Sequence, residues 1–321
     1  MTCSEALAEA LHEEMARDET IFILGEDLTA HAGIFGQFKG IPERFPGRII
    51  DTPISEAGIV GVGLGAALTG MRPFVDLHFS DFVTCCMDEL TNQTAKIRYM
   101  FGGQVSVPMV VWCPDGAGLR AAAQHSQSLE AWFVHTPGLK VVAPSEPADV
   151  KGLIKSAIRD DDPVMVFQHK KLFAKVGPVP KGDFTIPLGQ AAVKRTGKDV
   201  TILTYGSGFY LCQDALGELG TLNIDAEIVD LRTLKPLDMA LVAESIRKTH
   251  RAVIVHEACL TGGFGAELAA RIQDELFDYL DAPIKRVAAK DFPIPFSPPL
   301  EDYVLPRVSD VVEAVRAVTY R

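Results

Sequence analysis

The chain has 321 residues, of which 47% are hydrophobic and 23% charged, which fits two globular domains with a core in each. Its formal net charge of −11 argues against nucleic acid or an anionic membrane surface as the main partner, because both favour a basic protein face. No apolar run reaches the roughly 18 residues of a membrane span, and residues 1–19 alternate acids with alanine and leucine, unlike a signal peptide. We therefore expect a cytoplasmic protein that uses neither membrane nor nucleic acid.

Short β-branched runs alternate with amphipathic helical patterns along the chain. This rhythm predicts an α/β fold of two domains with mostly parallel sheets. A segment rich in proline and glycine, residues 174–187, predicts the boundary between domains at 1–180 and 185–321. In the first domain the predicted strands are residues 21–26, 48–51, 72–79, 107–112, 139–144 and 163–169. In the second domain we predict strands at 199–206, 224–232 and 251–257, with helices at 208–219 and 238–249.

The six cysteines show neither a C-x-x-C motif nor a metal-ligand spacing with histidine. We expect them to be buried free thiols, because free cysteine usually behaves as a small core residue. The neighbours Cys85 and Cys86 would point in different directions on a helix. They therefore do not predict a disulfide.

The stretch "DTPISEAGIVGVGLGAALTG", residues 51–70, contains a dinucleotide-binding pattern in the wrong context. Gly61, Gly63 and Ala66 match G-x-G-x-x-A, but that motif must follow directly on a strand and begin a helix. Here Ser55 is placed as the N-cap of a helix that already contains the glycines. Each glycine inside a helix costs about 1 kcal/mol relative to alanine. The sequence therefore predicts a glycine-rich helix in which close packing or another interaction offsets this cost.

One face of this helix has almost no side chains, and its first turn carries Glu56. The face consists of Gly58, Gly61, Gly65 and Thr69, and it suits close approach by another element of the chain or by another subunit. The helix dipole explains a carboxylate at this place by only about 0.3–1 kcal/mol. The surrounding residues are expected to be buried, and burial would favour the protonated, hydrogen-bond-donating form of Glu56. Such an acid can face a basic ring nitrogen.

The loop "DGAGLRAAAQHSQ" precedes a helical segment and carries His125 next to Ser126. Sequence neighbours do not build a Ser-His-Asp triad, whose members meet across the fold. Small residues predict a flexible loop, where an acid or base is often held over a cleft. A structural role for His125 remains open. His135 is a second candidate, equally well explained as a turn residue.

The words "DTPISEAGIVGVGLGAALTGMRPFVDLHFSDF", "KIRYMFGG", "AAAQHSQSLEAWFVHTPGLKVVAPSEPADVKGLIKSAIRDDDPVMVFQHKKLF" and "PIPFSPPLED" stand in one order along nearly the whole chain. With them the chain resembles the beta subunit of the thiamine-diphosphate-dependent component of 2-oxo acid dehydrogenase complexes. Within that family, "QHKKLF", "DDDPV" and "FSPPLED" are most similar to acetoin-cleaving enzymes, with pyruvate-specific enzymes next.

The resemblance implies a transketolase-like pyrimidine-binding domain followed by a domain of the transketolase C-terminal type. It implies cleavage of acetoin, or decarboxylation of a small 2-oxo acid such as pyruvate, with acyl transfer to lipoamide. By position, Glu56 would face the N1′ nitrogen of the aminopyrimidine ring of thiamine diphosphate and relay the activating proton. Phe82 would stack on that ring and Ile54 would lie near the bend of the cofactor, although core packing also explains both. His125 would assist acyl transfer to a lipoyl arm.

The family's G-D-G motif for the diphosphate and magnesium is absent, since "PDGAG" at 114–118 has proline in place of the first glycine. The resemblance therefore implies an alpha chain that holds Mg²⁺, an α2β2 heterotetramer and a lipoyl-bearing acyltransferase core. It also implies a K⁺ site on backbone carbonyls, which an ordinary acidic loop explains equally well; its residues would be Met109, Ala157, Asp160 and Asp162. The alternatives are a single-component transketolase or deoxyxylulose-phosphate synthase relative, and a catalytically silent docking subunit.

Overall fold

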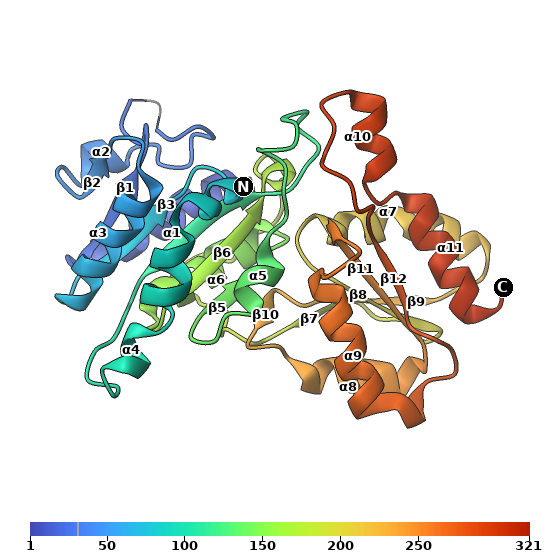
Figure 1. The fold of residues 1–321 in the computed structure, drawn as a ribbon. Coiled ribbons are helices and arrows are strands. Elements are labelled where there is room, and N and C mark those ends of the chain that lie inside the picture. Colours follow the sequence, from blue (N-terminus) through green and yellow to red (C-terminus); the bar gives the residue numbers. More distant parts are fainter. Residues whose placement is uncertain (31) are drawn as a thin grey trace. The chain divides into compact units, whose positions relative to one another are not determined.

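In the computed structural model, which describes residues 1–30 and 32–321, the chain divides into two compact units (Figure 1). Unit 1 comprises residues 1–115 and 132–188, and unit 2 comprises residues 116–131 and 189–321. The segment 116–131, which contains His125, thus groups with the C-terminal half of the chain. A division at a single linker does not anticipate this grouping. Whether residues 1–180 and 185–321 are independent domains stays a prediction.

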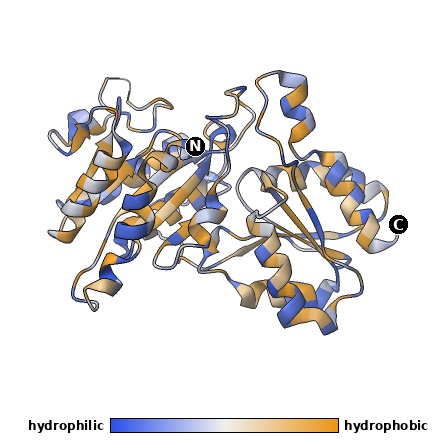
Figure 2. Ribbon diagram, viewed as in Figure 1, coloured by the Kyte–Doolittle hydropathy of each residue, from blue (hydrophilic) through white to orange (hydrophobic). Residues whose placement is uncertain are grey.

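A parallel sheet forms the centre of unit 1, with strands in the order β5-β6-β4-β3-β1-β2. Its strands are β1 (Ile21–Gly25), β2 (Ile49–Asp51), β3 (Arg72–Asp76), β4 (Val110–Asp115), β5 (Lys140–Val142) and β6 (Val164–His169). Each overlaps a predicted strand, which confirms those predictions. Most strand residues are buried and hydrophobic (Figure 2), as expected for a parallel sheet covered on both faces.

The helices of unit 1 lie before β1, in the connections between these strands and after β6. They are α1 (Cys3–Arg17), α2 (Ile41–Arg44), α3 (Glu56–Leu68), the 3-10 helix η1 (Ser80–Cys86), the π-helix η2 (Glu89–Thr94), α4 (Ile97–Met100), α5 (Glu130–Val134), which begins in the unit 2 segment, α6 (Pro147–Arg159) and the 3-10 helix η3 (Lys170–Leu172). A capping box of Thr2 and Glu5 starts α1. Helix α1 packs against α6.

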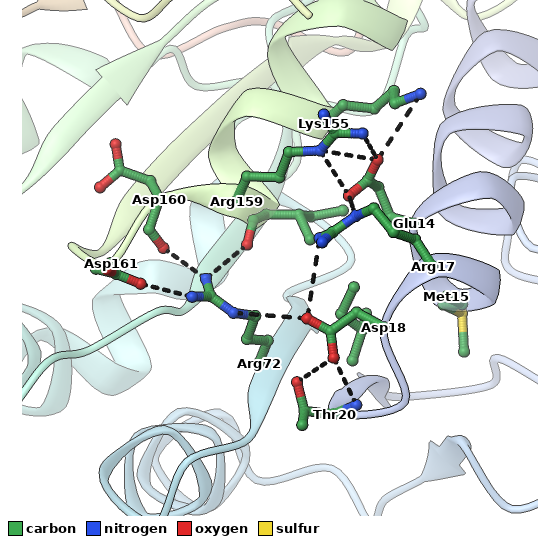
Figure 3. Close-up of polar contacts among 12 residues, drawn as sticks. Glu14, Met15, Arg17, Asp18, Thr20, Arg72, Lys155, Arg159, Asp160 and Asp161 are labelled. Carbon is green, nitrogen blue, oxygen red and sulfur yellow. Dashed lines mark hydrogen bonds and ion pairs between the residues drawn. The ribbon is translucent and has the colours of Figure 1, made fainter. Parts of the chain in front are cut away.

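Charged side chains lie inside the contact between α1 and α6 (Figure 3). Glu14 of α1 is buried and accepts hydrogen bonds from Arg17 (2.8 Å) and from Arg159 of α6 (2.6 Å). The Lys155 ammonium is 3.7 Å from the same carboxylate and 2.5 Å from Asp183. A buried charge is tolerated when it is paired and hydrogen-bonded, and this network meets that condition for Glu14.

Unit 2 is built around a five-stranded sheet of order β12-β11-β8-β9-β7, parallel except for the pair β7 and β9. The strands of unit 2 are β7 (Ala192–Arg195), β8 (Val200–Thr204), β9 (Ala226–Asp230), β10 (Thr233–Lys235), β11 (Ala252–Cys259) and β12 (Lys285–Ala289). Its helices are α7 (Ser207–Thr221), α8 (Met239–Thr249), α9 (Phe264–Leu276), the 3-10 helix η4 (Phe277–Tyr279), α10 (Pro298–Val304) and α11 (Val308–Thr319). The three predicted strands and two predicted helices are confirmed, whereas β7, β10 and β12 were not predicted.

The cysteine prediction is correct in part. All six thiols are free, and four of them are buried, but Cys85 and Cys259 are exposed. Cys85 and Cys86 lie on η1 with one side chain outside and the other inside, as expected for neighbours on a helix. Within the described residues, no helix is long and apolar enough to cross a membrane.

Candidate active site

The carboxyl ends of the unit 1 strands gather several ionisable side chains at one edge of the sheet. Ligands of open parallel α/β sheets bind outside this edge. Glu56 reaches it as the first residue of α3, directly after β2 and a short extended segment. Glu26 follows β1 at the same edge; burial raises the pKa of its carboxyl group, and the charge of Glu56 raises it further. Both carboxyl groups therefore belong to this edge.

The predicted burial of Glu56 differs from the structure. Its side chain is half-buried, and Ile54, two residues before it, is 80% exposed. Apolar residues surround Glu56 in the sequence, but the start of α3 lies at the rim of the unit, so those residues do not enclose it. Ser55 is the N-cap residue as predicted, although its side chain makes no capping hydrogen bond to the described residues.

The glycine face of α3 is exposed. The glycines lie inside the helix as predicted, and a Cβ atom built at Gly61 or Gly65 would meet no described atom within 4 Å. Gly63 lies on the opposite face, where a Cβ atom would be 2.8 Å from Cγ2 of Val75 in β3. Close packing within the chain therefore explains Gly63, but it does not explain Gly61 or Gly65.

Phe82 lies on η1, which packs against α3. Its half-buried ring meets Phe79 edge to face, with 5.7 Å between ring centroids. The charge of Glu56 also contributes to the raised pKa of the Cys86 thiol at the end of η1, after burial and Glu89. Glu56 and Phe82 therefore stand on neighbouring elements, and an aromatic face and a carboxyl group suit a planar nitrogen heterocycle.

Two ionisable residues at the end of β3 were not predicted. Burial raises the pKa of Asp76 to about 7, opposed by hydrogen bonds from the amide of His78 (2.6 Å) and from Gln37 (3.3 Å). His78 has a left-handed backbone with φ of 66°, and burial lowers the pKa of its imidazole. Both residues lie inside the predicted strand 72–79, whereas the observed β3 ends at Asp76, so no local pattern marked them as residues of the carboxyl edge.

His125 belongs to unit 2, where it lies half-buried in the segment 116–131. Long-range hydrogen bonds hold this segment, whereas its small residues predicted a flexible loop. The amide of Ala117 donates to Glu257 (2.6 Å) and the amide of Gly118 donates to Glu301 (2.6 Å). His135, the second candidate, is exposed on the turn that follows α5 in unit 1.

Three of the four carbonyl groups predicted to bind a monovalent cation, those of Met109, Ala157 and Asp160, already accept hydrogen bonds in the structure. Met109 O accepts from the amide of Val164 (3.0 Å), and Ala157 O accepts from the amide of Asp160 (3.3 Å). The Arg72 guanidinium donates to Asp160 O (3.0 Å), as Figure 3 shows.

Lysine and arginine side chains also neutralise the acidic run around this place. Lys140 contacts the carboxylates of Asp160 (2.7 Å) and Asp162 (3.3 Å), and Arg98 pairs with Asp162. These cations account for the acidic loop. The K⁺ site stays a prediction.

Comparison with known proteins agrees with this arrangement. The model of the transketolase pyrimidine-binding domain matches residues 1–175, and that of the transketolase C-terminal domain matches residues 189–311. The chain therefore belongs to the family of proteins that combine these two transketolase domains. The predicted fold class and family are thereby confirmed.

Relatives in the family match over nearly the full chain. The pyruvate dehydrogenase E1 component subunit beta of Rhizobium meliloti (strain 1021) is 45% identical over 100% of this chain and 70% of its own length. That of Rickettsia conorii is 46% identical over 100% of this chain and 98% of its own length. The acetoin:2,6-dichlorophenolindophenol oxidoreductase subunit beta of Cupriavidus necator is 45% identical over 97% of this chain and 95% of its own length. Among solved structures, "Split gene transketolase, inactive beta4 tetramer" matches with a TM-score of 0.82 and 25% identity, covering 100% of this chain and 98% of that one.

Proposed function

We propose that this chain is the beta subunit of a thiamine-diphosphate-dependent 2-oxo acid or acetoin dehydrogenase component. Its substrate is acetoin or a small 2-oxo acid such as pyruvate, and the acyl group passes to lipoamide. The observation that carries the proposal is Glu56 at the start of α3, beside Glu26 and next to the aromatic η1. Family relatives named for pyruvate dehydrogenase and acetoin oxidoreductase support the same class of reaction.

Thiamine diphosphate, when bound, supplies a carbon nucleophile that attacks the carbonyl group of the substrate. Glu56 would hold a proton against the basic N1′ nitrogen of its aminopyrimidine ring, and the ring of Phe82 would offer a stacking surface. Ile54, exposed in the chain alone, would lie near the bend of the cofactor. His125 would donate a proton to the lipoyl sulfur atom that leaves when the disulfide opens, while the other sulfur atom takes the acyl carbon.

A second chain would complete the site. This sequence has no G-D-G motif for the diphosphate and its Mg²⁺, so we assign both to an alpha subunit in an α2β2 heterotetramer. The exposed glycine face of α3 is our candidate for a subunit contact. The related split-gene transketolase is inactive as a beta4 tetramer, which agrees with the need for a partner. We place the enzyme in the cytoplasm, with a lipoyl-bearing acyltransferase core as acceptor and K⁺ as a further ligand.

The Glu56→Gln variant of the reconstituted two-chain enzyme tests this proposal. Glutamine keeps the size of the side chain but cannot relay a proton, so we expect turnover to fall by about 10²–10⁴-fold with assembly intact. Glu43→Gln removes an exposed carboxylate on α2 and serves as the matched control, with turnover close to that of the wild type. Turnover of Glu56→Gln near the control value would exclude Glu56 from this role.

A further inference from the structure

The segment that carries His125 is held at both ends by side chains of unit 2. At its start, the amides of Ala117 and Gly118 donate to the carboxylates of Glu257 and Glu301 (both 2.6 Å). At its end, buried Glu130 accepts a hydrogen bond from the Tyr205 hydroxyl (2.6 Å). The base is closed by the amide of Gly116, which donates to the carbonyl oxygen of Gln127 (3.1 Å). His125 lies between these fixed points.

Glu301 is the central acceptor of this anchor. Its side chain is fully buried, at 0% exposure, and it accepts from Arg120 Nη1 (2.6 Å) as well as from Gly118. Hydrogen bonds to a buried carboxylate are charge-assisted and strong. Glu301 therefore ties two positions of the segment to one point.

The motif "FSPPLED" explains why Glu301 is placed there. Its prolines begin α10, where proline is favoured at the first helical positions, and Glu301 follows in the first turn. Arg120 also donates to the carbonyl oxygen of Pro298 (3.1 Å) and contacts exposed Asp302 (2.8 Å). A short helix thus presents a buried carboxylate, a carbonyl and a second carboxylate to one arginine.

The backbone of the segment needs such an anchor. Positive φ angles alternate along it, with 83° at Gly116, 90° at Gly118, 60° at Arg120 and 62° at Ala122. Glycine adopts this conformation readily, but arginine and alanine do not, and it persists only where surrounding contacts impose it. The contacts of Arg120 with α10 are such constraints, and they stand five residues from His125 in the chain.

We propose that Glu301 and Arg120 are positioning residues that hold the His125 segment for acyl transfer. The inference rests on the proposed role of His125, and it adds a function for α10 that neither the resemblance nor the family match assigns. Glu257 supports the same segment from β11. A misplacement of about 1 Å in a catalytic group can lower a rate by about 10²-fold, so loosening this anchor should reduce the acyl-transfer step selectively.

The test uses the reconstituted enzyme with Glu301→Gln, Arg120→Ala, the double variant and His125→Ala. Glu313→Gln is the matched control, because Glu313 is an exposed carboxylate on the next helix, α11, outside the anchor. Hydrogen exchange of peptides covering 116–128 reports on the anchor without requiring activity. Reductive acylation of a lipoyl domain and substrate cleavage with an artificial electron acceptor report the two chemical steps separately.

We expect faster hydrogen exchange of residues 117–120 in Glu301→Gln and in Arg120→Ala. Exchange in the double variant should be little faster than in either single variant, because each substitution breaks the same Glu301–Arg120 contact. The kcat for reductive acylation should fall by about 10–100-fold while its KM and the artificial-acceptor rate change by less than about 2-fold. Arg120→Lys should recover part of the loss, because the cation is kept without the planar fork.

Unchanged exchange in both single variants would overturn the anchor. Faster exchange with unchanged acylation, or with a parallel fall of both steps, would overturn the positioning role. Failure of the proposed function is distinguishable, because His125→Ala would then lower both steps equally whatever the exchange of the segment shows.

Discussion

Alanine at Gly61 and Gly65 should have opposite effects on the chain alone and on its assembly. Both glycines are exposed within α3, and a Cβ atom at either meets no described atom within 4 Å. Alanine is favoured over glycine in a helix by about 1 kcal/mol per position. The double variant should therefore raise the free energy of unfolding of the isolated chain by about 1–2 kcal/mol, which corresponds to roughly 2–8 °C in Tm.

Gly63→Ala is the matched control on the covered face of the same helix. Its Cβ atom would lie 2.8 Å from Cγ2 of Val75 and 3.1 Å from Sδ of Met109. Overpacking of this kind costs about 1–3 kcal/mol, which cancels or exceeds the gain in helix propensity. This variant should therefore be no more stable than the wild type. Urea denaturation of the three chains, purified without a partner, measures the difference.

The same double variant should weaken binding of the alpha chain, because methyl groups would prevent close backbone approach at the proposed contact. Sedimentation velocity of the reconstituted mixture should show more free chains for Gly61→Ala/Gly65→Ala than for the wild type. A less stable isolated chain would show that the face is packed within the subunit. Unchanged assembly and turnover would refute the contact.

Three further predictions concern unit 1. The folded-state pKa of Asp76, about 7, lies above its ordinary 3.8, so its contribution is complete below pH 3.8 and is lost as the pH rises through 7. Urea denaturation should therefore show stability falling between about pH 4 and pH 7, less steeply in Asp76→Asn. Glu14→Ala should cost about 1–3 kcal/mol by chemical denaturation, because Arg159 loses its hydrogen bonds to this buried carboxylate while Lys155 keeps its pair with Asp183, whereas Glu275→Ala in an exposed pair should cost under about 1 kcal/mol. Calorimetry of the chain alone should detect no binding of thiamine diphosphate with Mg²⁺, since the G-D-G half is absent.

The central strands could be predicted because buried parallel strands are nearly continuous hydrophobic runs. The strands that were missed carry a weaker signal. β7 is a half-exposed edge strand with Lys194 and Arg195, and β12 is an edge strand that begins with Lys285 and Arg286. At an edge, charged residues protect against pairing with other chains, so they hide a strand from a search for apolar runs.

The anchor of the His125 segment could not be predicted for a different reason. Its acceptors, Glu257 and Glu301, lie 140 and 183 residues from the amides they bind. A sequence rich in glycine and alanine indicates a flexible backbone, and here only the distant acceptors Glu257 and Glu301 restrict it. Composition predicts what a loop is able to do locally, whereas its position depends on residues that no local pattern connects to it.

Glu56 was predicted to be buried but is half-buried in the chain alone, and this difference agrees with a site that a second chain completes. Ile54 and Val62 are apolar but 80% and 62% exposed, and the glycine face between them is uncovered in the described chain. The residues around Glu56 have the composition of a protein interior. Such a composition fits burial within one chain and equally burial at a contact between two chains. If burial occurs in the assembled enzyme, the residues that misled the prediction for one chain are those that a partner would cover. Glu56 would then be shielded from solvent only on assembly.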